Sequence, residues 1–327
     1  MDGENVINTL KKKLRIDFSK NTKLTFYLRG LWLVYAPRVL FYNFEQQYNA
    51  LSDKNKAYVD DRIGYYNKLD KIFQPPEDAK TISEFKKQQS RKTYFYDLYE
   101  YLRHFPSKNK ITYLFGDITY VPEAPTIVKS RPIGGDNQNS ILLKLNKVRH
   151  FIFVNDNLPF KDKKGMLVWR GKVHQSHRKA FFDNFFDHPL CNIGQTNNKA
   201  NDHFRWQKGK LSLKEMSQYK FILAIEGKDV ASNLKWVMSS NSLAMMVKPT
   251  YETWFMEGRL VPNHHYVLLK DDYSDLEEKI NFYAKHVDEA EAIINNAHAY
   301  VKPFKNNHFE GLISYGVLKK YYDFTEE

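Results

Sequence analysis

Apolar side chains in the first hundred residues recur at helical spacing. Residues 21–46 are apolar on nearly all sides and are interrupted at Pro37, and residues 57–73 repeat Tyr and Ile at helical intervals. Residues 83–104 place their aromatic side chains on one helix face. This spacing predicts helical segments whose aromatic faces pack against one another. The alternative is a surface patch that contacts lipid or an acceptor.

From Lys110 onward the apolar positions form short runs bounded by Gly, Asp and Pro, a pattern typical of strands. These runs are residues 111–117, 125–131, 150–156, 166–171, 220–225, 242–247 and 266–270. Helical patterns lie between the later runs, at residues 176–186, 232–238, 252–258 and 274–302. Because strands that alternate with helices favour a parallel sheet, the second half is predicted to be an α/β layer of the Rossmann type.

Length and composition favour two soluble domains. A chain of 327 residues corresponds to two domains of ~150 residues each. No segment approaches the ~20 consecutive apolar residues of a membrane-spanning helix, and the N-terminus lacks the apolar core of a secretory signal. Cys191 is the single cysteine, so no intrachain disulfide can form and a reducing, cytoplasmic compartment is expected.

The formal net charge of +12 indicates an anionic partner: nucleic acid, an anionic lipid surface or a phosphorylated small molecule. The P-loop and GxGxxG patterns are absent, which removes the commonest ATPase and dehydrogenase interpretations. His264 and His265 are adjacent rather than four positions apart, and Cys191 has no cysteine partner. A structural zinc site is therefore not expected.

Residues 224–236, AIEGKDVASNLKW, connect an apolar strand pattern to a helical pattern. We call this segment the joint. Ligands of open α/β sheets bind at the carboxyl ends of strands, where backbone N–H groups suit phosphate. Glu226 and Gly227 end the strand, and the glycine lets the backbone turn and approach a ligand. Ser232 can donate to a phosphate oxygen, and Lys235 adds positive charge one turn later. The alternative is a connection without a ligand, in which Ser232 only caps the helix.

Residues 168–178, VWRGKVHQSHR, repeat this arrangement. An apolar run ends at Arg170 and Gly171, and Arg178 follows at the start of the next helical pattern. Two guanidinium groups match a diphosphate because each offers paired N–H donors, although either could form a structural ion pair instead. In a third segment Glu252 stands at the predicted start of a helix, where it can cap that helix or accept hydrogen bonds from ribose hydroxyls.

Together these segments resemble glycosyltransferase family 90. The motifs are WRG with a later Arg (residues 169–178), YKFILAIEGKDVASNLKW (219–236) and the ExWF run that leads through LVPNHHYVLL to DDYSDLEEKI (252–280). The resemblance spans residues 110–302. The bacterial lipopolysaccharide branch is the most similar one, since the single Cys and the missing secretory signal disagree with the branch of the endoplasmic reticulum.

The resemblance implies a GT-B architecture, in which two Rossmann-like lobes face a cleft, here with a helical N-terminal extension. Residues 1–160 would form the acceptor lobe with that extension. Residues 161–302 would form the lobe that binds the nucleotide-sugar, and residues 303–327 would pack back on the first lobe. The implied activity is inverting transfer of a hexose or pentose from a UDP-sugar to a saccharide hydroxyl.

The resemblance also implies a donor site. Arg170 and Arg178 would bind the diphosphate, with Ser232 and the backbone of Gly227 nearby and Glu252 close. The remaining positions of this predicted site are Gly171, Glu226, Asn233 and Lys235. Animal members have Ser-x-Arg or Ser-Arg at the joint, whereas Asn233 follows Ser232 here. An Arg contact is therefore missing, or Lys235 replaces it.

Characterised animal members use an Asp that ends a short strand and precedes a Pro-containing loop. YLFGDITYVPEAPTIVKSR has this arrangement, so Asp117 is the predicted base, and Asp156 is the reserve candidate. Lys129 and Arg131 lie close in sequence to Asp117, and we expect them to bind an acidic acceptor or to assist the leaving diphosphate. The alternative for these two is a solvated loop. The family uses cationic side chains rather than a DxD-bound metal, so no metal or other cofactor is expected.

The resemblance gives the positive charge a use. Lipopolysaccharide acceptors are lipid-linked and anionic, so peripheral contact with the inner face of the cytoplasmic membrane is expected, through residues 11–15 and 28–38. Two rival functions stay open. One is a basic nucleic-acid-binding protein, for which no zinc-finger, RNP or basic-leucine-zipper pattern is present. The other is a catalytically silent relative that binds UDP or carbohydrate.

Overall fold

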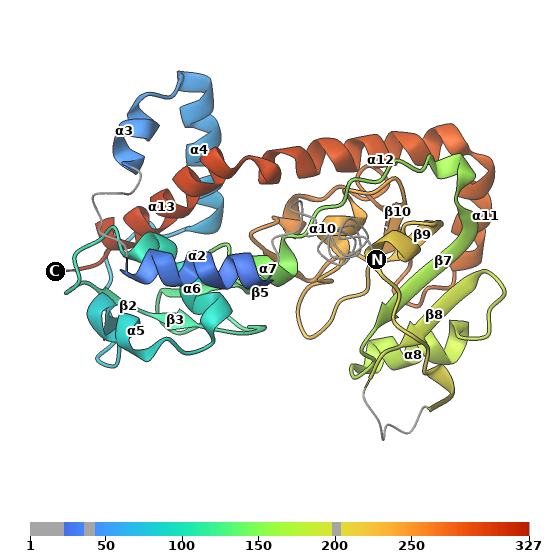
Figure 1. The fold of residues 1–327 in the computed structure, drawn as a ribbon, viewed down its shortest axis with the longest axis horizontal. Helices are drawn as coiled ribbons and strands as arrows, with labels where there is room; N and C mark the ends of the chain where they lie inside the picture. Colours follow the sequence, from blue (N-terminus) through green and yellow to red (C-terminus); the bar gives the residue numbers. More distant parts are fainter. Residues whose placement is uncertain (1–22, 36–42, 198–203, 327) are drawn as a thin grey trace, which may run out of the picture.

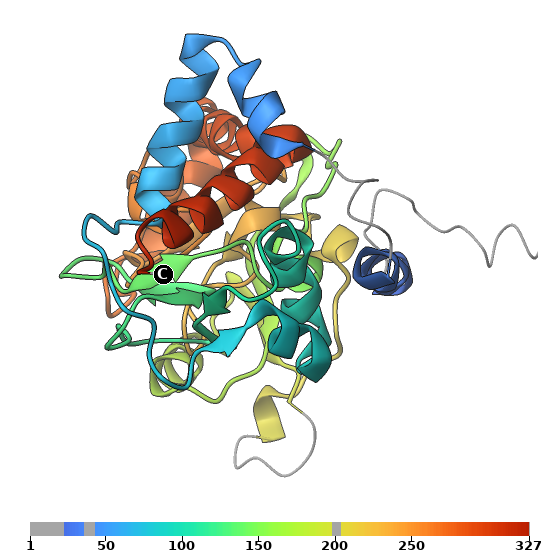
Figure 2. The ribbon, with the colours of Figure 1, turned by 90° about the vertical axis from the view of Figure 1, so that its left-hand side faces the viewer.

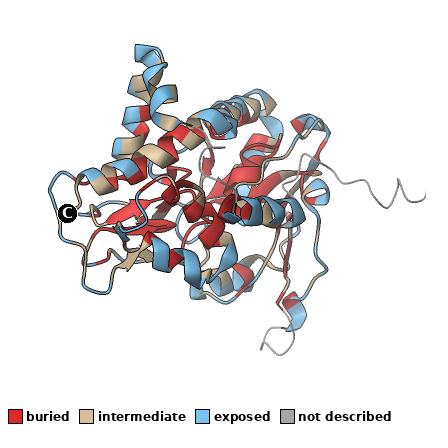
Figure 3. Ribbon diagram, turned by 60° about the vertical axis from the view of Figure 1, so that its left-hand side comes forward, coloured by how far each residue is buried: buried red, intermediate tan, exposed pale blue. Residues whose placement is uncertain are grey.

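The computed structural model describes residues 23–35, 43–197 and 204–326 of the chain. One group of elements surrounds a five-stranded sheet, and a second group gathers the N-terminal helices around a smaller sheet (Figure 1). Helix α12 (Val287–Val301) runs from the first group to helix α13 (Asn307–Asp323) in the second. Buried residues concentrate along both sheets and on the inward faces of the helices (Figure 3).

The larger sheet is parallel throughout. Its strands are β7 (Lys164–Gly171), β8 (Cys191–Gln195), β9 (Tyr219–Leu223), β10 (Leu243–Met246) and β12 (Val267–Leu268). They lie in the order β12-β10-β9-β7-β8, and each neighbouring pair is parallel. A parallel sheet is covered on both faces, which explains why its strands are continuous apolar runs. The predicted α/β layer with a parallel sheet is confirmed.

Alternating side chains of this sheet enter two separate cores. Phe221 and Leu223 of β9 join one core, which also contains apolar residues of helices α8 (Ser176–Phe185) and α11 (Leu276–Lys285). Ile222 joins the other core, which includes residues of the short helices α9 (Leu213–Met216) and α10 (Leu234–Val237). This second core continues into the N-terminal helices, so it connects the two groups of elements.

The N-terminal group combines helices with short strands. Its helices are α2 (Lys23–Tyr35), α3 (Phe44–Asn49), α4 (Asp53–Tyr66), α5 (Ile82–Gln88), α6 (Lys92–Leu102) and α7 (Lys147–His150). Strands β3 (Tyr113–Leu114), β4 (Thr126–Val128) and β6 (Ser140–Leu142) form a three-stranded parallel sheet with β4 in the centre. Two antiparallel pairs complete it: β1 (Lys80–Thr81) with β2 (Lys110–Ile111), and β5 (Ser130–Pro132) with β11 (Tyr251–Thr253). Single 3-10 turns are η2 (Phe160–Asp162), η3 (Phe204–Trp206), η4 (Glu257–Arg259) and η5 (Lys302–Lys305).

Helix α13 packs beside α4, and both lie next to the small sheet (Figure 2). Its buried Glu310 accepts hydrogen bonds from Arg62 at 2.6 Å, from Lys144 at 2.7 Å and from the indole N–H of Trp254 at 2.7 Å. The three donors come from α4, from the loop after β6 and from the segment after β11. The carboxylate of Glu310 therefore links α13, near the end of the chain, to α4, to the loop after β6 and to the segment after β11.

Several predicted elements differ in the structure. Residues 252–258 are not helical: Tyr251–Thr253 form β11, because they pair with β5, and a turn and η4 follow. Residues 150–156 form no strand: His150 ends α7, residues 151–156 are irregular, and the hydroxyl of Ser239 accepts from the backbone N–H of Val154. Residues 274–302 break at His286 into α11 and α12, and residues 83–104 divide into α5 and α6. Pro37 lies outside the described residues.

Candidate functional site

The strand order defines a crevice in the larger sheet. Strand β7 lies between β8 and β9, although β8 follows β7 along the chain and β10 and β12 continue beyond β9. The connections after β7 and β9 therefore leave in opposite directions. Open parallel sheets bind ligands at such a switch point, at the carboxyl ends of the strands. The segments that follow β7 and β9, which include Lys172 and Gly227, border this crevice.

Arg178 of α8 bridges the two strand ends. Its guanidinium donates to the carbonyl oxygens of Lys172 (2.7 Å), Ile225 (2.9 Å) and Glu226 (2.7 Å). The group also stacks over the indole of Trp169, 5.2 Å from the ring centroid. No carboxylate within the described residues forms an ion pair with it, and burial lowers the pKa of Arg178 to about 10. A partly buried cation without an anionic partner suits an anionic ligand.

Hydrogen bonds fix the conformation of the joint after β9. The backbone N–H of Gly227 donates to the carbonyls of Asp229 and Val230, which closes a tight turn beside Arg178. The carboxylate of Glu226 accepts from the N–H of Thr250 (2.9 Å) and from its hydroxyl (2.5 Å), and burial raises the pKa of Glu226. Glu226 therefore fixes the loop, and only its backbone carbonyl reaches Arg178.

Lys129 connects Asp117 to the joint. The ammonium of Lys129 lies 2.5 Å from Oδ1 of Asp117 and 2.6 Å from Oδ2 of Asp229. The contact with Asp229 lacks the angles of a hydrogen bond, so this pair interacts through charge. Burial alone would lower the pKa of Lys129, but the two carboxylates outweigh it and raise that pKa. Lys129 is thus a permanent cation held between two anions.

Exposure distinguishes the two carboxylates. The side chain of Asp117 is 42% exposed, whereas that of Asp229 is buried at 5%. Asp117 follows Gly116, whose φ of +128° requires glycine, so the chain turns sharply just before the carboxylate. Asp117 can therefore reach a substrate, while Asp229 serves to hold Lys129. Asp229 lies within residues 224–236, but spacing in the sequence gives no signal of its lysine partner 100 positions earlier.

The chain is similar in sequence to known glycosyltransferases. The sequence profile of glycosyl transferase family 90 matches residues 141–317, more than half of the chain. The chain is also 42% identical, over 312 residues, to the O-glucosyltransferase LpsA of Dichelobacter nodosus, across 93% of this chain and 96% of that protein. The chain belongs to glycosyltransferase family 90. The resemblance inferred from the three motifs is confirmed, and the protein is a glycosyltransferase.

Within this family 90 protein, Arg170 and Arg178 do not share one side of the sheet. Trp169 faces α8, where its ring contacts Phe182, and Arg178 stacks on that ring. The next residue, Arg170, must point to the opposite face. There it donates to the carbonyl of Asn192 at 2.7 Å and to its side chain at 2.8 Å. The two side chains therefore lie on opposite faces of the sheet, and the structure does not bring both arginines to one turn.

Three other predicted contact residues are structural. Lys235 is completely buried and pairs with Glu257 at 2.7 Å. Glu252 lies in β11 rather than at a helix start, where it pairs with Arg131 at 2.7 Å and accepts from the hydroxyl of Tyr65. These buried charged groups form internal ion pairs because an unpaired charge in the core costs several kcal/mol. Neither Lys235 nor Arg131 has a free donor face for a ligand.

The predicted cap at the joint also differs. Ser232 is exposed and makes no capping hydrogen bond, and the N-cap of α10 is Asn233. The side chain of Asn233 points toward the end of β9, where its N–H donates to the carbonyl of Leu223 at 2.8 Å. Helix α10 has four residues, so its dipole contributes little to anion binding. Gly171 is close to Trp169, where an added Cβ would lie 2.5 Å from the ring.

Asp156, the reserve candidate for the base, is part of an internal network. Its carboxylate pairs with Lys163 at 2.6 Å and accepts from the backbone N–H groups of Asn241 (2.9 Å) and Leu158 (3.1 Å). These contacts connect the loop before β7 to the turn before β10. A carboxylate with most of its accepting positions filled is poorly suited to take a proton from a substrate.

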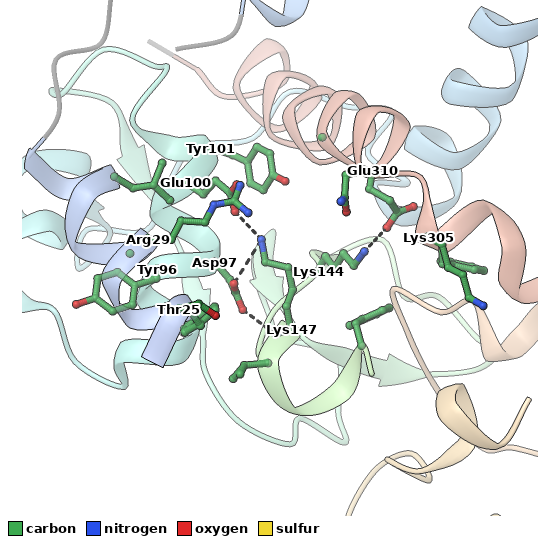
Figure 4. Close-up of a pocket in the computed structure, with 18 of the residues that line it drawn as sticks. Thr25, Arg29, Tyr96, Asp97, Glu100, Tyr101, Lys144, Lys147, Lys305 and Glu310 are labelled. Carbon is green, nitrogen blue, oxygen red and sulfur yellow. Dashed lines mark hydrogen bonds and ion pairs between the residues drawn. The ribbon is translucent and has the colours of Figure 1, made fainter. Parts of the chain in front are cut away.

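A large cavity lies apart from all these residues. Its volume is about 1260 Å³, and α2, α6, α7 and the start of α13 contribute to its walls. Figure 4 shows an ion network in its wall, in which Lys147 contacts Glu100 at 2.5 Å and Asp97 at 3.4 Å, and Arg29 contacts Glu100 at 2.6 Å. Burial raises the pKa of Asp97 to about 6. None of the predicted site residues lines this cavity.

No group of three or more metal-ligating side chains occurs in the part of the chain that the structure describes. The paired carboxylates Asp117 and Asp229 contact one ammonium group. The site offers a partly exposed carboxylate, Asp117, on one side of a loop and a partly buried guanidinium, Arg178, on the other.

Proposed function

We propose that the protein transfers a sugar from a UDP-sugar to a saccharide hydroxyl with inversion of the anomeric centre, and that Asp117 is the base. The observation that carries this proposal is the contact of Lys129 with both Asp117 and Asp229. It brings a partly exposed carboxylate of the N-terminal group against the loop that borders the switch point of the larger sheet.

Arg178 is the residue we assign to the diphosphate. It is partly buried at the switch point, it has paired N–H donors, and only carbonyl oxygens accept from it among the described residues. A diphosphate would supply the missing negative charge. The backbone of Gly227 approaches the guanidinium closely, since an added Cβ would lie 3.4 Å from its nitrogen. This supports a donor site formed by Arg178 and the turn at Gly227.

The chemical step needs one proton acceptor and one stabilised leaving group. The acceptor oxygen attacks the anomeric carbon from the side opposite to UDP while its proton passes to the carboxylate of Asp117. The bond from that carbon to the β-phosphate oxygen breaks, and its electron pair leaves with UDP. Arg178 stabilises the added negative charge on the diphosphate. Lys129 contacts the carboxylate of Asp117 and holds it in position, and Asp229 holds Lys129 in place.

We propose glucose as the transferred sugar and lipopolysaccharide or a related glycolipid as the acceptor. The support is the name of the relative from Dichelobacter nodosus, an O-glucosyltransferase, together with 42% identity over 93% of this chain. The proposal includes a metal-independent reaction at the inner face of the cytoplasmic membrane. Loss of turnover on addition of a chelator would overturn the metal-independent part.

We also propose the GT-B arrangement of two Rossmann-like lobes, with residues 1–160 as the acceptor lobe and 161–302 as the donor lobe. The parallel sheet β3-β4-β6 in the first part and the five-stranded parallel sheet in the second support this division. The packing of α13 against α4 and α6 supports the return of residues 303–327 to the first lobe.

The test is an assay of UDP release from a panel of UDP-sugars, with and without a glycolipid acceptor. We expect UDP-glucose to be hydrolysed slowly and UDP to raise the melting temperature. Asp117→Asn should lose at least about a hundredfold in transfer rate, which is typical for a missing base, and should keep its stabilisation by UDP. Asp156→Asn is the matched control for the base, because its carboxylate is internal. Transfer that survives Asp117→Asn would overturn the assignment of the base.

Two outcomes separate the rival functions. Stabilisation by UDP without transfer to any acceptor would indicate a silent relative. Binding of nucleic acid that falls steeply with salt, with no response to UDP, would indicate a nucleic-acid-binding protein.

A further inference from the structure

Helix α2 exposes large apolar side chains to solvent. The exposed fractions are 66% for Leu24, 58% for Leu28, 44% for Leu31, 54% for Trp32 and 76% for Tyr35. These five are half of the ten large apolar residues that are exposed among the described residues, and α2 has only 13 residues. Such a concentration on one short helix marks an interaction surface, whereas single exposed apolar residues do not.

The five side chains form one continuous stripe. At 100° per residue, they fall within an arc of about 100° around the helix axis, with Leu31 and Trp32 at its two edges. Gly30, Leu33 and Val34, which are buried, lie on the opposite side. We call the stripe of Leu24, Leu28, Leu31, Trp32 and Tyr35 the outer face of α2. A surface helix normally presents polar residues on this side.

The opposite face of α2 is attached to the body of the protein. Gly30 lies against the ring of Tyr96, so closely that an added Cβ would be 2.5 Å from it. Arg29 pairs with Glu100 of α6 at 2.6 Å, and Arg103 donates to the carbonyl of Leu33. Contacts at two turns of the helix fix its rotation. The outer face is therefore held toward solvent by the fold, and Figure 2 shows α2, in dark blue, at the edge of the molecule.

Length decides how such a helix can meet a bilayer. Thirteen residues extend about 20 Å, well short of the ~30 Å hydrocarbon core. None of the helices in the described ranges meets the length and apolarity that a membrane crossing requires. The outer face can instead lie in the plane of the interface, about 5–10 Å deep, where Trp and Tyr are favoured.

Charge favours an anionic bilayer over other apolar partners. Helix α2 contains no acidic residue, and residues 1–42 contain eight basic and three acidic residues. Basic residues near an anionic surface each contribute about 1 kcal/mol to binding. The same surplus would repel a second copy of this basic chain. We infer that the outer face of α2 docks the protein on an anionic lipid surface.

The inference does not depend on the sugar-transfer proposal, because it concerns binding in the absence of any nucleotide. Its test is flotation of the full-length protein with vesicles of phosphatidylcholine alone or with 30% phosphatidylglycerol. We expect binding to the anionic vesicles that weakens in high salt. Leu28→Asp and Leu24→Asp should each lower the vesicle partition coefficient by roughly tenfold or more, since each places a charge in the apolar stripe.

The matched control is Ile72→Asp, because Ile72 is 72% exposed but lies outside α2. It should bind vesicles like the wild type. All variants should keep the wild-type melting temperature and the response to UDP, which separates lost docking from lost folding.

Three results would overturn the inference: no vesicle binding by the wild type, equal binding by Leu28→Asp, or equal binding to vesicles without anionic lipid. A wild-type dimer that Leu28→Asp converts to a monomer, measured by light scattering, would assign the outer face to a second copy instead. Failure of sugar transfer with intact vesicle binding would affect the proposed function alone.

Discussion

The buried and partly buried cations of this protein differ in the groups that neutralise them. Lys129, Arg131 and Lys235 each contact at least one carboxylate within 2.7 Å. Arg178 instead donates to three carbonyl oxygens, and burial lowers its pKa to about 10. Carbonyl dipoles orient a guanidinium but do not cancel its charge. Arg178 is therefore the residue at which an anionic ligand gains most.

Arg178 and Arg170 should differ in their contribution to UDP binding. Arg178→Gln should weaken UDP binding by about 10–100-fold, since hydrogen bonds to charged groups contribute about 1.5–3 kcal/mol each. Arg170→Gln should leave UDP binding within about twofold of wild type, because Arg170 lies on the other face of β7. Isothermal titration with UDP measures both. An equal loss in the two variants would mean that both side chains reach the diphosphate.

Asp97 gives a prediction for pH dependence. Its folded-state pKa of about 6 lies above its ordinary value of 3.8, so the protonated form stabilises the fold. This contribution is complete below about pH 4 and is lost as the pH rises through 6. Relative to Asp97→Asn, the wild type should gain roughly 2–3 kcal/mol in unfolding free energy between pH 7 and pH 4. Urea denaturation at both pH values checks this. A constant difference between the two proteins would contradict the raised pKa.

At the scale of single elements, β7 determines where the crevice side chains lie. Trp169 and Gly171 share one face of this strand, and an added Cβ at Gly171 would come 2.5 Å from the ring of Trp169. The same ring supports Arg178. Packing at the end of β7 is therefore connected directly to the candidate donor site.

Gly171→Ala should consequently affect both stability and ligand binding. We expect a loss of about 1–3 kcal/mol in unfolding free energy from the forced shift of Trp169, together with weaker UDP binding as Arg178 moves. Gly165→Ala is the control on the same strand, since an added Cβ there meets nothing within 4 Å. Its stability should change by less than about 0.5 kcal/mol. If Gly171→Ala is neutral in both measurements, Trp169 does not position Arg178.

The elements that sequence could predict are those whose patterning is local. Runs such as residues 220–225 are apolar in sequence, and β9 forms there because parallel strands are buried on both faces. Glu252 could not be predicted in the same way. Its segment has helical spacing, but Tyr251–Thr253 pair with Ser130–Pro132, about 120 positions earlier. A partner that distant leaves no periodic signal, and the same holds for Lys129 and Asp229.

The proximity of the two strand ends was predictable from the sequence, but the contacts of their side chains were not. The joint at Glu226 and Gly227 and the residues after Trp169 do border one crevice, as the strand-end argument required. Whether Arg170 faces the crevice depends on which residues of β7 point toward α8. Trp169 points toward α8, since its ring contacts Phe182, so its neighbour Arg170 points to the opposite face. Lys235 and Arg131 looked like ligand contacts because sequence shows charge without showing burial.

At the scale of the whole molecule, the C-terminal helix completes the core of the N-terminal group. Helix α13 packs against α3, α4 and α6 and buries Ile313, Val317, Leu318 and Tyr321 in the larger core. Its position is also fixed by polar contacts, because Asn67 donates to the carbonyl of Val317 at 3.0 Å. Residues near the two ends of the chain therefore fold as one unit with the small parallel sheet.

Glu310 is the residue on which this unit most depends. Its carboxylate neutralises Arg62 and Lys144 together, and these cations bring its pKa below the ordinary value although burial alone would raise it. Glu310→Gln would leave two buried cations with no carboxylate, so we expect a loss of about 3–5 kcal/mol in unfolding free energy. Asp323→Asn on the same helix breaks an exposed pair with Lys319 and should cost less than about 0.5 kcal/mol. Guanidinium denaturation of both variants measures the difference, and similar losses would mean that apolar packing alone holds α13 in place.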